Sequence, residues 1–292
     1  MNIVSLKKSF RSWVSAALQR APEERTRLFM TEVADRNADY YNALVFEGIP
    51  EEARRVKLVA AGALDYLEKS VELEEAFDFT AAGLRAFAGE FMGMFPDCGQ
   101  GMTLVVMQAL GRFDGREKLL NGVPVAGFGV ECFLAGSGQN AHSREKELRL
   151  TAAHEMFHLY HGMKTGIWQE RGRPVITWVW VDGLAAYASK QLNPGATYAD
   201  ALGGDELGRA CSGSFRDFFH VAAPALLSVD TEDQRALFNA GRHYNGLPTR
   251  IGYALGLMAV EQLAAKGFSL AEMSSWPEER ATAELRSVFF SW

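Results

Sequence analysis

The chain has 292 residues, 48% of them hydrophobic, which is enough to bury a large core in one or two globular domains. A net charge of -6 argues against nucleic acid as a main partner, because a phosphate-binding surface needs an excess of basic residues. The three cysteines, Cys98, Cys132 and Cys211, are widely spaced, so we expect a reducing, cytoplasmic location rather than a disulfide framework.

The N-terminal segment from Ile3 to Leu18 has apolar side chains at helical spacing, with basic residues between them. Two interpretations fit this pattern: a first helix that docks onto the core, or a peripheral contact with an anionic membrane. The chain has no run of 18 apolar residues, so no transmembrane segment is expected.

Several helix-start signals follow in the first hundred residues. Proline precedes acidic residues at Pro22 and Pro50, and Thr80 is expected to cap a further helix. We therefore predict a helical N-terminal region over residues 1–100, followed by a second domain over 101–292. The helical region carries no group of residues that indicates chemistry.

The composition changes after residue 101, where a small β-sheet is predicted. Thr103–Met107 and Val125–Leu134 are rich in β-branched and apolar residues, and Asp114 with Gly115 is a turn signal. Gly127 and Gly129 would leave one strand face bare. This bare face either admits a peptide substrate that adds to the sheet or marks a bulge.

The next segment, Thr151–His161, reads Thr-Ala-Ala-His-Glu-Met-Phe-His-Leu-Tyr-His. In a helix one turn separates His154 from His158, so both imidazoles can reach one metal ion, as in the His-Glu-x-x-His zinc hydrolases. Glu155 points about a quarter turn away, which is the position of the general base in these enzymes. The alternative is that ordinary protein partners satisfy both histidines and no metal binds.

This helix is expected to begin after Ser143, a good N-cap residue. Near its end, His161 lies two turns beyond His154, too far to bind the same ion. His161 is predicted either to contact the substrate or the metal ligands, or to be a partly exposed histidine at the helix end.

A candidate third ligand follows the histidines. Val175–Val181 has the composition of a strand, and Asp182 would start the helix after it. Asp182 is then either a helix cap or a metal ligand. The small side chains of Ala185 and Ala186 favour the second interpretation, because they would let another helix approach closely.

The histidine motif and the run Trp180–Tyr187 together resemble the gluzincin branch of the zincin metallopeptidases, which carries a glutamate ligand in a Glu-Gly-x-Ala-x-Tyr-like helix. The chain is also similar to bacterial predicted zinc-dependent proteases of unknown substrate. Their late Pro-x-x-x-Gly-Tyr-x-x-Gly element is matched by Pro248–Gly256. The departure is Asp182, which is one methylene shorter than the family's glutamate. Glu170 is the fallback ligand.

The resemblance implies an α+β, mostly helical zincin-like fold, with the small sheet ahead of the metal-site helix and the peptidase domain over residues 101–292. It implies Zn²⁺ held by His154, His158 and Asp182, and Glu155 as the general base. The expected donors to the oxyanion and contacts to the substrate are in one late segment: Tyr253 first, then His243 and Tyr244, with Arg250 beside them.

The predicted function is hydrolysis of a peptide or protein substrate by a zinc peptidase. Glu131, on the strand ahead of the site helix, would bind a free amine if the enzyme were an aminopeptidase. One alternative is a degenerate zincin that binds metal or protein partners without catalysis. Another is a helical interaction module that binds no metal.

Overall fold

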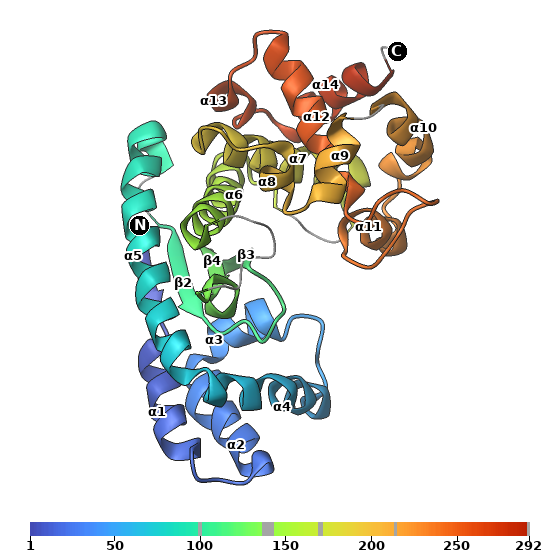
Figure 1. Cartoon of the computed structure of the whole chain (residues 1–292). Helices are drawn as coiled ribbons and strands as arrows, with labels where there is room; N and C mark the ends of the chain where they lie inside the picture. The colour runs from blue at the N-terminus through green and yellow to red at the C-terminus, as the bar shows by residue number, and fades with distance from the viewer. Residues whose placement is uncertain (99–100, 136–142, 169–171, 213–214, 291–292) are drawn as a thin grey trace. The chain divides into compact units, whose positions relative to one another are not determined.

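The structure is a computed structural model that describes residues 1–98, 101–135, 143–168, 172–212 and 215–290 (Figure 1). The predicted fold class is confirmed, because the described chain is mostly helical and has a small four-stranded mixed sheet. Contacts divide the chain into two compact units, Met1–Glu155 and Met156–Trp292. This division falls inside the helix that carries the histidine motif, and does not coincide with the boundary expected near residue 100.

The first unit begins with a short strand, continues as a run of helical elements and then forms three further strands. In chain order they are β1 (Asn2–Ser5), α1 (Lys7–Ala17), α2 (Pro22–Phe29), η1 (Met30–Ala34), η2 (Asp35–Asn37), α3 (Ala38–Tyr40), η3 (Tyr41–Val45), α4 (Glu52–Glu68), α5 (Ser70–Met94), η4 (Pro96–Cys98), β2 (Thr103–Met107), β3 (Gly115–Leu120), β4 (Val123–Gly129) and η5 (Val130–Phe133). Helix α6 (Arg144–Thr165) begins in this unit and ends in the second.

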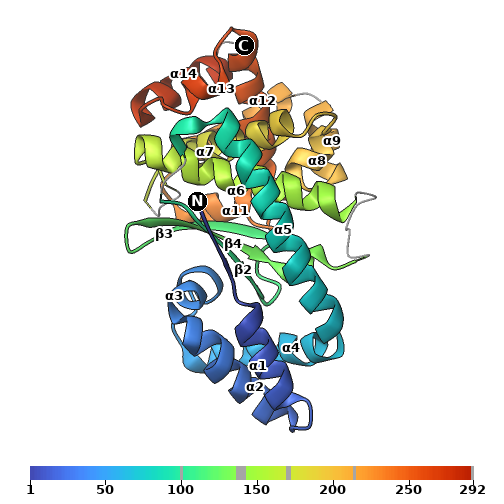
Figure 2. The ribbon, with the colours of Figure 1, turned by 90° about the vertical axis from the view of Figure 1, so that its left-hand side faces the viewer.

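The sheet has the strand order β1-β2-β4-β3. Strands β1, β2 and β4 are parallel, and β3 is antiparallel to β4. Strand β1 corrects the start of the helical pattern predicted from Ile3, because Asn2–Ser5 form a strand and the helix begins at Lys7. Asn2 pairs with Thr103, about a hundred residues away, a contact that no local pattern indicates. Figure 2 shows this dark blue N-terminal strand beside the green strands, and α5 packs against β1 and β2.

Strand β4 is shorter than predicted and has neighbours on both edges. It ends at Gly129, and the chain continues as a 3-10 turn. A Cβ on Gly127 would lie 2.8 Å from Leu44 Cδ1, and one on Gly129 would lie 2.8 Å from Ala109 Cβ. The two glycines therefore allow close packing. The prediction that a peptide adds to the sheet beside them is wrong, because β2 and β3 already occupy both edges of β4.

Three side chains of the apolar stripe on helix α1 are buried in the protein core. Phe10, Trp13 and Ala17 are fully buried, and the Trp13 indole donates a hydrogen bond to the Arg25 carbonyl oxygen. Docking onto the core therefore accounts for the stripe without a membrane. Within the described residues, no helix combines the length and the apolar character needed to cross a membrane.

Helix α5 runs without a break through Thr80, so the predicted cap at this residue is wrong. Thr80 is completely buried in the middle of the helix. Large apolar side chains on the same helix, including Phe77 and Phe87, are also buried. The packing of these buried side chains of α5 outweighs the local preference of threonine for a helix start.

The described residues of the second unit form helices and connecting loops, with no strand among them. After the end of α6 its elements are α7 (Val175–Leu192), α8 (Tyr198–Leu202), α9 (Asp205–Ser212), α10 (Phe215–Leu226), α11 (Thr231–Phe238), α12 (Ile251–Ala265), α13 (Leu270–Met273) and α14 (Glu278–Phe290). Ser269 caps α13, because its hydroxyl accepts a hydrogen bond from the Glu272 backbone N–H.

Helix α7 packs directly against α12, as Figure 1 shows. The strand predicted for Val175–Val181 is wrong: these residues form the first two turns of α7. The two helices meet backbone to backbone, because a Cβ on Gly183 would lie 2.6 Å from Gly256 Cα. A Cβ on Gly256 would in turn lie 2.7 Å from Gly183 Cα. Only glycine at both positions permits this approach.

We expect Gly183→Ala to lower the free energy of unfolding by about 1–3 kcal/mol, because the added methyl group must push α12 away. Gly89→Ala is the matched control, since Gly89 lies in α5 with nothing near its Cβ position. That substitution should stabilise the protein by about 0.5–1 kcal/mol through helix propensity. Urea denaturation of both variants measures the difference, and equal effects would contradict the tight crossing.

Candidate metal centre

Helix α6 carries the histidine motif and begins as predicted. The Ser143 hydroxyl accepts a hydrogen bond of 3.2 Å from the Lys146 backbone N–H, which makes Ser143 the N-cap. The guanidinium of Arg149 pairs with both carboxylate oxygens of Glu90 on α5. Leu148 and Ala152 are buried on this helix, so its first half is fixed to the core of the first unit.

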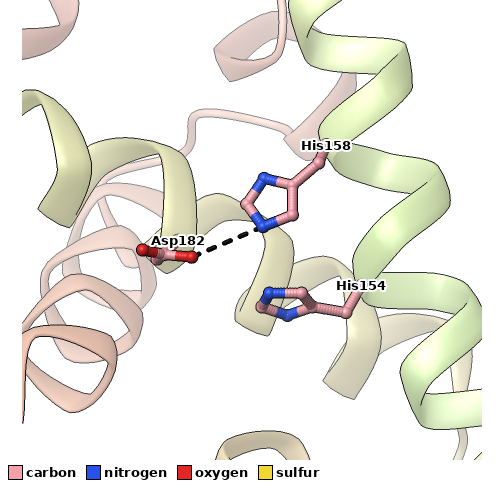
Figure 3. A group of neighbouring side chains, drawn as sticks. All are labelled: His154, His158 and Asp182. Carbon is pink, nitrogen blue, oxygen red and sulfur yellow. Dashed lines mark ion pairs between the residues drawn. The ribbon is translucent and has the colours of Figure 1, made fainter. Parts of the chain in front are cut away.

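Three side chains of α6 and α7 come together as a candidate metal centre. One ligand atom each of His154, His158 and Asp182 lie within 4.8 Å of one another. Figure 3 shows both imidazoles extending from α6 toward the Asp182 carboxylate on α7. The predicted set of two histidines and one aspartate is therefore a group that could hold a metal ion.

The distance between two of these donors is close to the one expected around a tetrahedral metal ion. His158 Nε2 lies 3.4 Å from Asp182 Oδ1. A charged N–H···O bond is shorter, at about 2.7–2.9 Å. Two donors that are each about 2.0–2.2 Å from one tetrahedral zinc ion lie roughly 3.3–3.6 Å apart. The observed distance matches the second geometry better than the first.

Burial also favours a cation at this position. Asp182 is 1% exposed and His158 is 4% exposed. A carboxylate taken out of water is costly, by several kcal/mol, unless a positive charge lies beside it. A protonated His158 would supply such a charge, whereas a metal ion would engage His154 as well. His154 is the half-buried member of the group, so solvent reaches the centre on its side.

Asp182 is an interior residue of α7 and not its cap. The helix starts seven residues earlier, at Val175. The capping interpretation is therefore wrong, because it depended on the predicted strand. Ala185 and Ala186 are buried as expected, but the closest backbone approach of α7 is made by Gly183 to α12.

Glu155 packs against the first residue of strand β3. A Cβ on Gly115 would lie 2.8 Å from Glu155 Oε1, and Thr151 lines the same contact. Glu155 is 7% exposed. Glycine at position 115 thus makes room for the carboxylate of the predicted general base.

His161 is buried, so the predicted partly exposed histidine at the helix end is wrong. Its Nε2 atom accepts a hydrogen bond of 3.3 Å from the indole N–H of Trp180 on α7. Burial, together with the neighbouring His158, lowers the pKa of His161 to about 3, so its imidazole is neutral at physiological pH. The sequence predicts a strand over Val175–Val181, and so it indicates no role for Trp180 at the site.

The residues predicted as oxyanion donors and substrate contacts lie in the late segment that ends in the first turn of α12. The Tyr253 ring, in the first turn of α12, lies 5.5 Å from the Phe238 ring, and the Arg250 guanidinium lies 4.7 Å from the Tyr253 centroid. His243 is exposed, and its Nδ1 atom lies 2.9 Å from the Leu247 carbonyl oxygen. Burial raises the pKa of Tyr244. Their roles at the metal donors stay predictions.

Glu131 holds a loop of the first unit. Its carboxylate accepts hydrogen bonds from the Tyr66 hydroxyl at 2.7 Å and from the backbone N–H groups of Gly111 at 2.9 Å and Ala109 at 3.1 Å. Burial raises its pKa. These contacts account for Glu131 without a substrate amine. The fallback ligand Glu170 lies outside the described residues.

The chain matches no protein-family model and no curated protein sequence. Its resemblance to the gluzincins stays a prediction, and function is inferred from the geometry of the site.

We expect the protein to bind one zinc ion per chain and Asp182→Asn to weaken this binding. The loss should exceed the roughly 10–100-fold that removal of an outer hydrogen-bond partner costs a metal site. Dialysis against zinc followed by metal analysis gives the stoichiometry, and competition with a chromophoric chelator gives the affinity.

His220→Ala is the control for this experiment, because His220 is an exposed histidine on α10 and not one of the three donors. It should bind zinc as the wild type does. Wild-type affinity in Asp182→Asn would mean that the aspartate is not a ligand.

Proposed function

We propose that this chain is a zinc-dependent peptidase, with His154, His158 and Asp182 as metal ligands and Glu155 as the general base. The observation that carries the proposal is the convergence of the three donor atoms within 4.8 Å, with Glu155 next to a ligand on the same helix. Two imidazoles and one carboxylate are a ligand set of catalytic zinc sites, which leave one position open.

The chemistry divides between the ion and Glu155. When bound, zinc supplies Lewis acidity, which lets water act as a nucleophile near neutral pH and polarises a substrate carbonyl. The Glu155 carboxylate accepts a proton from the attacking water and returns it to the leaving amine. Half-buried His154 leaves the centre accessible to water and substrate on one side.

An extended peptide is the substrate that best suits the surroundings of Glu155. Among the described strands, β3 has β4 as its only strand neighbour, so it is an edge of the sheet. An edge strand offers backbone donors and acceptors to an extended chain. Glu155 lies against Gly115, the first residue of this strand. In this proposal Tyr253 supplies the oxyanion donor, as the family resemblance implies.

We expect Glu155→Gln to retain zinc and to lose activity on a peptide-library substrate by about 10²–10⁴-fold, because the amide cannot accept the proton. Glu145→Gln is the matched control, since Glu145 is an exposed glutamate in the first turn of the same helix. It should keep full activity. Unchanged hydrolysis in Glu155→Gln would remove the proposed base.

The same assay separates the proposal from its rival. A wild-type protein that binds zinc stoichiometrically but cleaves nothing in a broad peptide library would favour the degenerate zincin, which binds metal or partners without catalysis.

Gly115→Ala tests whether the strand positions the base. The new methyl group would occupy the space of the Glu155 carboxylate, so turnover should fall about tenfold or more while zinc affinity stays unchanged. Gly93→Ala is the control, because nothing lies near the Cβ position of this α5 glycine. Peptidase rates of the zinc-loaded variants provide the measurement. Normal turnover in Gly115→Ala would show that the carboxylate does not depend on this contact.

A further inference from the structure

We propose that the hydrogen-bonded pair of His161 and Trp180 positions the metal ligands by fixing α7 against α6. This inference rests on the proposed function, because it concerns the same metal centre. It assigns a positioning role to two side chains that are not themselves ligands.

The pair links the same two helices that carry His158 and Asp182. His161 follows His158 by three residues on α6, and Trp180 precedes Asp182 by two residues on α7. The indole N–H of Trp180 donates to His161 Nε2 over 3.3 Å. A buried hydrogen bond therefore joins the two helices less than one turn away from the proposed ligands on each of them.

The Trp180 side chain is held in place by an aromatic stack. Trp180 is completely buried, and its ring stacks on Trp276 with 5.4 Å between centroids and 7° between planes. Trp276 in turn meets the Phe268 ring edge-on, at 5.0 Å and 82°. The indole of Trp180 cannot slide without breaking this stack, so its N–H group is fixed in direction.

The acceptor keeps its state over the working range of pH. Because burial lowers the pKa of His161 to about 3, its imidazole is neutral at neutral pH, and the indole N–H of Trp180, which can only donate, makes Nε2 the accepting nitrogen. Loss of the indole N–H would leave this nitrogen buried without its donor, which is unfavourable. The hydrogen bond is therefore a persistent link.

A fixed spacing matters here because the third ligand is an aspartate. Its carboxylate is separated from α7 by one methylene, so it cannot follow a shift of the helix as a longer side chain can. Displacements of about 1 Å are enough to spoil a functional site. The 3.4 Å between His158 Nε2 and Asp182 Oδ1 depends on where α7 lies relative to α6.

Two conservative substitutions in the same aromatic stack test the role. Trp180→Phe keeps an aromatic ring but removes the donor to His161. Trp276→Phe makes the same change in the neighbouring ring, keeps an aromatic face on which Trp180 can stack, and leaves the hydrogen bond intact. We expect Trp180→Phe to bind zinc about tenfold more weakly, the lower end of what outer partners contribute. Trp276→Phe should bind zinc as the wild type does. Chelator competition gives the affinities, and melting temperatures show that each variant is folded.

A double-substitution cycle gives a readout that simple destabilisation would not produce. His161→Leu should weaken zinc binding as much as Trp180→Phe does. The variant that carries both changes should be no weaker than either alone, because the two side chains act through one bond. The visible spectrum of bound Co²⁺ should change in the same variants, since it reports the geometry of the donors.

Different results would contradict the positioning role and the proposed function. Equal zinc affinities for Trp180→Phe and Trp276→Phe, or additive losses in the double variant, would overturn the positioning role while the metal site stands. A wild-type protein that binds no zinc would overturn the proposed function, and this inference with it.

Discussion

The structure depends on one buried carboxylate and the groups that neutralise it. Asp182 is the only charged residue between Val175 and Ser189, in a helix segment whose other residues are apolar, small or uncharged. A carboxylate in the interior is tolerated only when positive charge and hydrogen-bond donors surround it. The two imidazoles of α6 face it, and a cation shared by all three side chains would satisfy this requirement at once.

Contacts on several sides of α7 fix the position of this carboxylate. Gly183, the next residue, brings α7 into backbone contact with Gly256 of α12. Trp180 links α7 to α6 through His161, and near the start of the helix the Thr177 hydroxyl donates to Glu278 of α14 at 2.7 Å. A helix held at three places along its length cannot easily rotate or slide, so its one acid stays aimed at the histidines.

The sequence predicted the local features of the site and the approach of Asp182 to the two histidines, but missed the other tertiary contacts. The spacing of His154 and His158 and the cap at Ser143 were readable because one helix contains them all. The predicted start of α7 at Asp182 was wrong, because the β-branched and aromatic residues before it favour a strand locally. Only their complete burial between helices overrides that preference. Strand β1 and the hydrogen bond between His161 and Trp180 join segments far apart in the chain, and no local pattern indicates such contacts.

The shorter acid suits the site that the fold builds around it. An aspartate loses fewer side-chain rotations than a glutamate when it becomes ordered, so less entropy opposes ligand formation. Its disadvantage is short reach, which matters only if the helix is far away or mobile. Here Asp182 Oδ1 already lies 3.4 Å from His158 Nε2, a spacing suited to one tetrahedral ion. In the proposed metal site, the backbone contacts and the buried indole that fix α7 would therefore make the shorter side chain sufficient, because the helices and not the side chain would keep the donors in place.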